Sequence, residues 1–311
     1  MLAEKLEGAV DGIGLYGLAP PRLEMAEDRQ RELADQQRAR IEALGCDGLV
    51  VYDIQDEGDR NAAPRPFPFL PTVDPSAWAA ALAPLPVPAI IYKSVPGASA
   101  ETLKAWLRGR TGPVVLVGAP SARTGALKLT DAYALAREQA PQLVVGGVAI
   151  PERHLRSYEE HLRMLAKTAA GCRFFVTQAV YDVSSSLSVL SDYALELGRR
   201  GERPRPIIFT FAPCGSARTL DFMKWLGISF PRWLENELLY SPDILERSVR
   251  LCERNFRELK AFAREKKLPM GFNVESVSIR KAEIDAATAL FHALRAASDE
   301  TLLPAGALDP T

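Results

Sequence analysis

The chain has 311 residues, 47% of them hydrophobic and 25% charged, which is typical of a globular protein built as one large α/β barrel or as two smaller domains. Its 38 basic and 39 acidic residues give a formal net charge of -1, so overall charge gives no reason to expect a nucleic acid or a membrane as partner. The N-terminus lacks the apolar core of a secretory signal, and no apolar run approaches the ~20 residues of a membrane span, which together predict a cytoplasmic protein.

The first half of the chain alternates between apolar runs and segments with helical periodicity. The apolar runs predict strands at 13–18, 48–54, 89–95 and 114–117, and the periodic segments predict helices at 25–44, 78–82, 100–107 and 129–138. Ser99 is expected to cap the third of these helices. The connection before the helix at 78–82 contains five prolines and no periodicity, which favours a lid or a binding loop.

The second half repeats the same strand–helix unit, most clearly at 143–182. There a buried strand at 143–150, a polar turn at 151–154, an amphipathic helix and a second buried strand at 174–180 follow one another. Two more strands are predicted at 207–211 and 270–277. Further helices are predicted at 187–199, 220–226, 243–267 and 281–297.

Eight strand–helix units in strict alternation predict the α/β class and a closed (β/α)8 TIM barrel, with an extra helical insertion after the seventh strand. A doubly wound open sheet is the competing architecture. It is disfavoured because no G-x-G-x-x-G turn follows the first strand. We expect a single domain over 1–311, with the proline-rich loop at about 55–75 and an irregular tail at about 298–311.

Polar side chains follow the predicted strands, and in a barrel the carboxyl ends of all strands meet at one mouth. A mouth of this kind suits a polar, partly charged ligand, although any single residue there could equally belong to a solvated loop. The residues concerned are Asp53, Gln55, Asp56, Lys93, Ser94, Glu152, His154, Gln178, Asp182, Cys214 and Glu275.

Three of these positions carry the strongest chemical signals. Gln178 ends a central strand, where an amide can donate to and accept from a heterocycle, or can instead satisfy local backbone. Glu152 and His154 could serve as acid, base or phosphate ligand, or could cap the following helix. Glu275 lies in an otherwise buried strand, so its carboxyl must be paired, hydrated or shifted in pKa, which makes it a candidate acid or base.

No metal site is predicted. The four cysteines are widely separated and form no CxxC pair, so free thiols are expected. The acidic side chains after the second strand could hold a cation, but their close spacing beside Arg60 favours a solvated loop. These acidic residues are Asp53, Asp56, Glu57 and Asp59.

Several short motifs resemble the methylenetetrahydrofolate reductase family, flavin-dependent (β/α)8 enzymes that reduce 5,10-methylenetetrahydrofolate to 5-methyltetrahydrofolate. The most specific is Thr177-Gln178 followed by Tyr181 and Asp182. The others are Ala19-Pro20-Pro21-Arg22, Pro151-Glu152-Arg153-His154, Ala170-Gly171-Cys172 and Lys281-Ala282-Glu283.

The resemblance implies specific roles for individual residues. Gln178 would contact the pterin ring and Tyr181 would line the folate face, with Asp53 and Tyr92 as further substrate-binding candidates at the mouth. His154 and Lys167 would lie beside the flavin, and Gly118 would belong to the cofactor loop after the fourth strand. The implied cofactors are NAD(P)H and FAD, with tetrahydrofolate as substrate.

The chain also departs from the family pattern. The glutamate that protonates folate in the family is replaced by Gly17, and the Arg-Gly-Asp segment after the fourth strand reads Val117-Gly118-Ala119-Pro120. Tyr92 replaces a histidine of the third strand. The sequence is therefore more similar to a divergent, single-domain branch, some members of which are thought to work without flavin.

Three functions compete on this basis. The leading hypothesis is a reductase that passes hydride from NAD(P)H to methylenetetrahydrofolate, with Glu275 or Glu152 replacing the lost acid. The second is a methyl or one-carbon transferase that uses tetrahydrofolate. The third is a folate-binding protein without catalysis. The sequence leaves the oligomeric state open.

Overall fold

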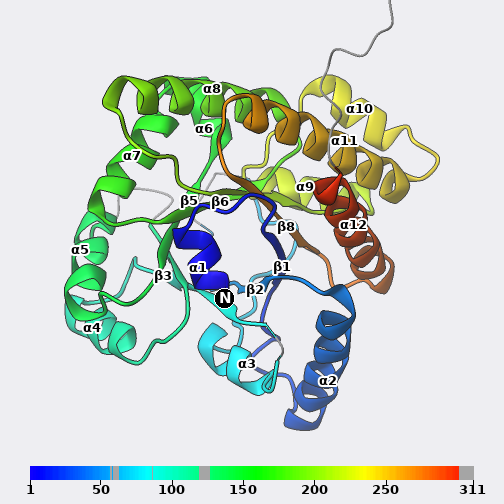
Figure 1. Ribbon diagram of the computed structural model, residues 1–311. Helices are drawn as coiled ribbons and strands as arrows, with labels where there is room; N and C mark the ends of the chain where they lie inside the picture. The colour runs from blue at the N-terminus through cyan, green and yellow to red at the C-terminus, as the bar shows by residue number, and fades with distance from the viewer. Residues whose placement is uncertain (57, 59–62, 86, 119–126, 301–311) are drawn as a thin grey trace, which may run out of the picture.

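The computed structural model describes residues 1–56, 58, 63–85, 87–118 and 127–300. Within these residues eight parallel strands pair in sequence order into a closed barrel, which confirms the predicted architecture and excludes the open sheet (Figure 1). The strands are β1 (Gly14–Leu18), β2 (Gly48–Val51), β3 (Ala89–Ser94), β4 (Val114–Val117), β5 (Val145–Ala149), β6 (Phe174–Ala179), β7 (Ile207–Phe211) and β8 (Met270–Glu275).

Helices surround the barrel, and the insertion after β7 consists of two helices ahead of the long one that returns to β8 (Figure 1). Ser99 caps α4 as predicted, because its hydroxyl accepts from the backbone N–H of Thr102 at 3.1 Å. The helices are α1 (Leu2–Glu7), α2 (Glu27–Leu44), α3 (Pro75–Ala81), α4 (Ala100–Arg108), α5 (Leu129–Gln139), α6 (Pro151–Ser157), α7 (Glu160–Ala170), α8 (Val183–Arg200), α9 (Ala217–Trp225), α10 (Arg232–Leu239), α11 (Ile244–Glu265) and α12 (Lys281–Asp299).

One local expectation was wrong. The segment at 151–154 is not a polar turn but the start of α6, because Pro151 stands at the first helical position, where its fixed φ favours a helix and its missing N–H costs nothing. α12 ends at Asp299, and most of the tail expected at about 298–311 falls outside the described residues. Glu57, Asp59, the loop at 119–126 and residues 301–311 lie outside the described part of the chain.

The barrel interior is filled by side chains at alternate positions of the strands, as the two-residue repeat of a strand requires. The short helix α1, which the sequence did not predict, closes the N-terminal end of the barrel by adding Leu2 and Leu6 to this cluster (Figure 1). The interior cluster also contains Ile13, Leu15, Val50, Ile90, Tyr92, Val115, Val144, Phe174, Val176 and Ile208.

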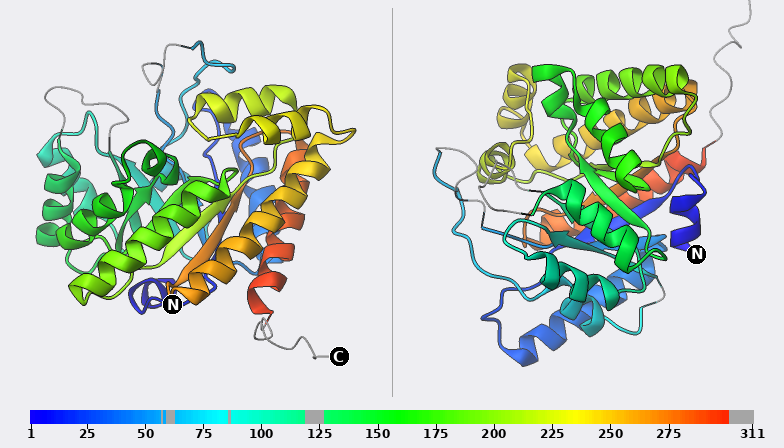
Figure 2. Two further views of the ribbon diagram at one scale, coloured as in Figure 1. Left: turned by 90° about the horizontal axis from the view of Figure 1, so that it is seen from above. Right: turned by 90° about the vertical axis from the view of Figure 1, so that its left-hand side faces the viewer.

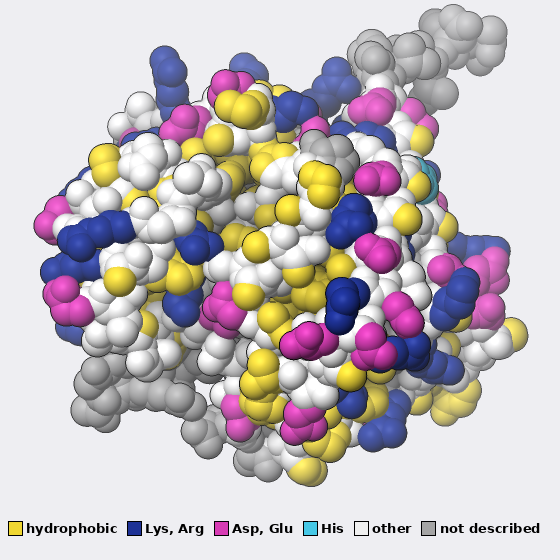
Figure 3. All heavy atoms as spheres, turned by 90° about the horizontal axis from the view of Figure 1, so that it is seen from below, with side chains coloured by type: hydrophobic (Ala, Val, Ile, Leu, Met, Phe, Trp, Pro, Cys, Tyr) yellow, Lys and Arg dark blue, Asp and Glu magenta, His cyan; other side chains and the backbone are white. Residues whose placement is uncertain are grey.

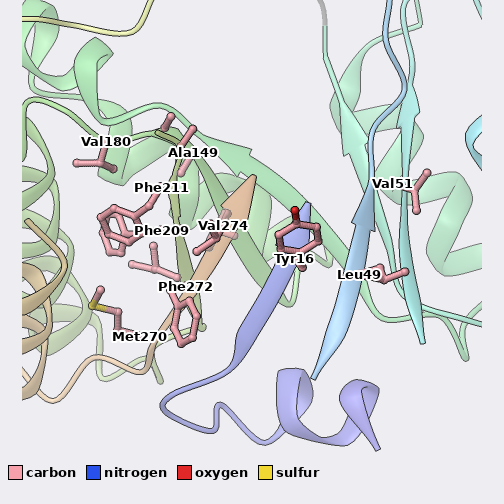
Figure 4. Packing of buried hydrophobic residues seen from close by; sticks show 14 of the residues in the cluster. Tyr16, Leu49, Val51, Ala149, Val180, Phe209, Phe211, Met270, Phe272 and Val274 are labelled. Atoms are coloured by element: carbon pink, nitrogen blue, oxygen red, sulfur yellow. The ribbon is translucent and has the colours of Figure 1, made fainter. Parts of the chain in front are cut away.

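A second, larger core lies between the barrel and its helices. Outward-facing residues of β7 and β8, including Phe209, Phe211 and Phe272, pack here together with Tyr16 of β1 (Figure 4). The rings of Phe272 and Phe291 lie 5.3 Å apart, so β8 packs on α12. All four cysteines are buried and free, as predicted from their spacing.

The proline-rich connection after β2 rises on the side of the barrel opposite α1 and packs on α9 (Figure 2). Trp225 donates its indole N–H to the carbonyl of Ala63 at 3.0 Å, and Arg218 donates to the carbonyl of Pro66 at 3.0 Å. The rings of Phe67 and Phe222 meet edge to face at 5.3 Å. The loop is therefore tied to the insertion after β7, across the mouth of the barrel.

Charged side chains of both signs are interspersed over the face shown in Figure 3, which agrees with the near-zero net charge of the chain. Among the described helices, none combines the length and the apolar character needed to cross a membrane.

Candidate functional site

The candidate site is the barrel mouth, meaning the C-terminal ends of the strands and the residues that follow them. The inward positions of the strands continue beyond the interior cluster into this region. At this level Gly17, Tyr52, Tyr92, Asn273 and Glu275 come from β1, the end of β2, β3 and β8. The inward-facing side chains are thus apolar inside the barrel, whereas at this end they carry hydroxyl, amide and carboxyl groups.

Gly17 and Glu275 are paired in register on the adjacent strands β1 and β8. A Cβ atom added at Gly17 would lie 2.9 Å from the hydroxyl of Tyr52 and 3.1 Å from the Cβ of Glu275. The space next to β1 is therefore already filled by these two side chains. A larger residue at position 17 would have to displace them.

Glu275 is the carboxyl among these five residues, and its surroundings shift its pKa. Burial raises the pKa of its carboxyl to about 7, and a hydrogen bond with Tyr52 opposes part of that rise. Burial, followed by the charge of Glu275, raises the pKa of both Tyr52 and Tyr92. At neutral pH Glu275 can therefore exchange a proton, whereas the two tyrosines remain neutral donors.

A hydrogen-bonded network supports Glu275 from the side of the barrel core. The amide nitrogen of Asn273 donates to the hydroxyl of Tyr52 at 2.8 Å and lies 3.2 Å from the hydroxyl of Thr210. Because the Tyr52 oxygen accepts from Asn273, its own proton is free to point toward Glu275. Thr210 in turn donates to the carbonyl of Thr177 at 2.8 Å. The network links β8, β7 and β6 behind the carboxyl.

Glu152 also lies at the mouth, in the first turn of α6. Burial raises the pKa of its carboxyl to about 7, against hydrogen bonds from the backbone of Glu152 itself and of Ser229. Its Oε2 atom is buried without a hydrogen-bond partner among the described residues. Nearby, the Gln178 side chain donates to the carbonyl of Leu226 at 2.9 Å. The segment after α9 therefore touches both side chains.

The predicted substrate-binding residues are not equivalent. Asp53 ties two strand ends together, since its carboxylate accepts from the backbone N–H of Ser94 at 2.7 Å and from the amide of Gln55 at 2.6 Å. The ring of Tyr92 packs edge to face on Tyr52 at 4.9 Å, directly beside Glu275. Tyr181 is buried in the outer core and donates its hydroxyl to the carbonyl of Ala212 at 2.7 Å.

The residues assigned to flavin by the resemblance do not present free polar groups at the mouth. His154 is fully buried and bonds Asp192 of α8 at 3.0 Å, and the ammonium of Lys167 donates to the carbonyl of Val148 at 2.5 Å. Gly118 ends the described part of its loop. This set does not fit a flavin, so no step of the chemistry is assigned to one.

Other residues expected at the mouth are used for packing. Lys93 faces outward, with its ammonium 5.8 Å from the centre of the Trp106 ring, and Cys214 is fully buried. Tyr52 and Asn273 were not among the predicted residues of the mouth. Strand alternation could have found both, because Tyr52 follows the inward Val50 by two residues and Asn273 precedes Glu275 by two.

Fold and site together define a (β/α)8-barrel protein with polar, ionisable groups at the C-terminal ends of its strands. An uncharacterized protein from Clostridium thermocellum that binds two copies of 5-methyl-5,6,7,8-tetrahydrofolic acid shares 41% sequence identity with this chain. The similarity covers 95% of this chain and 99% of the other, with a TM-score of 0.85. The chain belongs to the same family as that protein.

Two other comparisons are more distant. A dihydropteroate synthase from Xanthomonas albilineans gives 13% identity and a TM-score of 0.45, over 94% of this chain and 95% of that one. A chitinase domain from Pyrococcus furiosus gives 11% identity and a TM-score of 0.48, over 94% and 99%. Neither carries a functional argument. No protein-family model and no curated protein matches the chain.

Proposed function

We propose that this protein binds a reduced folate at the barrel mouth and reduces 5,10-methylenetetrahydrofolate to 5-methyltetrahydrofolate with NAD(P)H, in the cytoplasm and without a flavin. The folate ligand of the Clostridium thermocellum relative supports the substrate class. The motifs around Gln178, which resemble methylenetetrahydrofolate reductases, support the reaction.

The observation that carries the proposal is the position of Glu275. Its carboxyl lies beside Gly17, the position at which the reductase family has its proton donor, and its raised pKa keeps a large fraction protonated near neutrality. In the proposed reaction Glu275 gives a proton to N10 of the folate as the bond between N10 and the methylene carbon breaks. The resulting iminium carbon accepts hydride from the nicotinamide, which leaves as NAD(P)⁺.

Other residues of the mouth would position the folate. Gln178 has an amide that could reach the pterin once its bond to Leu226 opens, and Tyr92 offers an aromatic face beside the acid. Asp53 holds the ends of β2 and β3 together and so fixes that side of the mouth. Glu152 is the second candidate for the proton donor.

The test is anaerobic oxidation of NADH or NADPH in the presence of 5,10-methylenetetrahydrofolate, with folate affinity measured separately by calorimetry. Replacing Glu275 by Gln should lower kcat by about 100-fold or more, because general acid catalysis contributes about 10²–10⁴-fold, and should leave folate affinity nearly unchanged. Glu152→Gln tests the second candidate, and it should lower kcat far less if Glu275 is the proton donor. Full turnover in Glu275→Gln would reject Glu275 as the acid.

A second candidate function is methyl or one-carbon transfer, or folate binding without catalysis. It is favoured by the fact that the relative binds 5-methyltetrahydrofolate, which already carries the group to be transferred. Calorimetry with that compound, followed by chromatography of the recovered folate, separates the cases. Tight binding with no NAD(P)H oxidation and an unchanged ligand would favour a binding protein, whereas loss of the methyl group to an acceptor would favour a transferase.

The purified, desalted protein should be colourless, because His154 and Lys167 are engaged away from the mouth. The check is an absorbance spectrum, with the free flavin released by heat as the reference. Flavin bands that persist after desalting would contradict the flavin-free reaction and restore the ordinary reductase mechanism.

A further inference from the structure

Three helices bring together a group of side chains that the folate proposal does not use. His154 lies on α6, His161 on α7 and Asp192 on α8, in the helical layer outside the barrel. Glu152 and His154 are two residues apart on α6, so they point to nearly opposite sides of that helix. Glu152 lies toward the mouth, and His154 faces α8.

The geometry of this group is close to that of a metal site. His154 Nε2 lies 3.0 Å from an Oδ2 of Asp192, and the rings of His154 and His161 are 5.4 Å apart. One nitrogen from each histidine and one carboxylate oxygen all lie within 4.8 Å of one another. Around a tetrahedral zinc ion with bonds of about 2.0–2.1 Å, ligand atoms lie roughly 3.3 Å apart. Small side-chain rotations would close that difference.

The two histidines also have unused ligand capacity. His154 is fully buried, and its Nδ1 atom has no hydrogen-bond partner among the described residues. The Nδ1 atom of His161 is in the same situation. A buried imidazole nitrogen without a partner is unusual, because buried polar groups nearly always form hydrogen bonds.

The turn between α6 and α7 is built to bring His161 over His154. Tyr158 ends α6 with a φ of +53°, which is uncommon for a residue other than glycine, and its N–H donates to the carbonyl of His154 at 2.7 Å. The Tyr158 ring packs edge to face on the His154 ring at 5.4 Å. The chain therefore reverses directly above His154, and α7 begins two residues later.

We propose that His154, His161 and Asp192 bind one late first-row divalent cation such as Zn²⁺ or Co²⁺, with water completing its coordination. Imidazole and carboxylate ligands suit these ions. His161 is partly exposed and the Asp192 side chain is 41% exposed, so a cation can enter from solvent. The bound ion joins α6, α7 and α8, and through α6 it holds the helix that carries Glu152 at the mouth.

The test uses Co²⁺, because it gives visible absorbance when bound by nitrogen and oxygen ligands at low coordination number. The full-length protein is treated with a chelator, desalted and titrated with CoCl₂. We expect one Co²⁺ per chain, displaced by Zn²⁺. His161→Ala and Asp192→Ala should each weaken binding by more than about 10-fold, since loss of even an outer-shell partner has an effect of that size. Both side chains are partly exposed, so these variants should fold.

The third histidine of the chain, His292, provides the matched control because it is exposed on α12. His292→Ala should bind Co²⁺ as the unmodified protein does. Zn²⁺ should raise the melting temperature of the unmodified protein and of His292→Ala, but it should not raise that of His161→Ala. No visible Co²⁺ band, equal binding in His161→Ala and Asp192→Ala, or loss of binding in His292→Ala would overturn the proposal. No folate enters the experiment, so its outcome is independent of the proposed reaction.

Discussion

Gly17 and Glu275 show how the chemistry of the mouth depends on single residues. The absence of a side chain at Gly17 leaves room for the hydroxyl of Tyr52 and the Cβ of Glu275. The carboxyl of Glu275 is buried against Tyr52, and Asn273 holds Tyr52 in place through a hydrogen bond. In the proposed reaction, an acid carried by β8 would therefore act in the space next to β1 without any change in the barrel.

The buried carboxyl of Glu275 should make the protein less stable at alkaline pH. Its pKa of about 7 in the folded state is above the ordinary 4.5, so the stability it contributes is complete below about pH 4.5 and is lost as pH rises through 7. Glu275→Gln should therefore raise the free energy of unfolding by about 2–3 kcal/mol at pH 8 and change it little at pH 4.5. Urea unfolding at both pH values measures this.

Glu258→Gln is the control, since Glu258 is exposed on α11 and its replacement should change the free energy of unfolding little. An equal effect of Glu275→Gln at both pH values would mean that Glu275 is not buried in its charged form. The expected gain in stability and loss of turnover in the same variant would show that the acid is kept for function.

At the scale of elements, the barrel depends on what closes its N-terminal end. α1 has only six residues and could not be stable alone, yet Leu6 is fully buried and Leu2 nearly so. A Cβ added at Gly48 would lie 2.5 Å from Leu2, so β2 has a glycine where α1 approaches. Tertiary packing therefore holds this helix in place.

Leu6→Ala should lower the free energy of unfolding by about 3 kcal/mol, because it opens a cavity at the base of the barrel. Urea unfolding followed by circular dichroism measures the change. Leu195→Ala on α8 is the matched control, since Leu195 is 54% exposed and should change stability by less than about 0.5 kcal/mol. A similar loss in both variants would mean that α1 does not seal the interior.

At the scale of the whole molecule, Asp47 links the two ends of the chain. Its carboxylate accepts from Lys5 of α1 at 2.6 Å, from Arg295 of α12 at 2.7 Å and from the backbone N–H of Gly14 at 2.7 Å. Burial alone would raise the pKa of Asp47, but these hydrogen bonds outweigh it and lower the pKa. The first and last elements are thereby joined at the base of the barrel.

Asp47→Asn should reduce the free energy of unfolding at pH 7 by about 2 kcal/mol, the usual contribution of hydrogen bonds to a charged group. The lowered pKa means that this contribution is present above the ordinary pKa of 3.8 and is lost as pH falls further, so the difference should shrink at pH 3. Asp35→Asn, in a pair whose carboxylate is 71% exposed, should change little. Undiminished destabilisation at pH 3 would contradict the role of the charge.

The alternation of apolar runs with helical segments was enough to predict a closed barrel, because each strand–helix unit has its own period and turn residues. It also placed Glu275 at the mouth, because a carboxyl is costly to bury inside an otherwise apolar strand and is therefore expected at its end. The short elements were less predictable. The sequence of α1 contains no pattern that predicts a helix, and only packing on the barrel holds it in place. Pro151 can begin a turn as easily as a helix.

The sequence by itself determined the number and order of the strands, because both follow from the local alternation of apolar runs with helical periodicity. Only the tertiary structure decided which of their residues meet. The register of β1 and β8 places Glu275 against Gly17, although the two residues are 258 positions apart in the chain. Likewise, the turn at Tyr158 and the packing of α6 on α8 bring His154 to His161 and Asp192. Contacts between distant segments depend on how elements pack, and no local pattern encodes that packing.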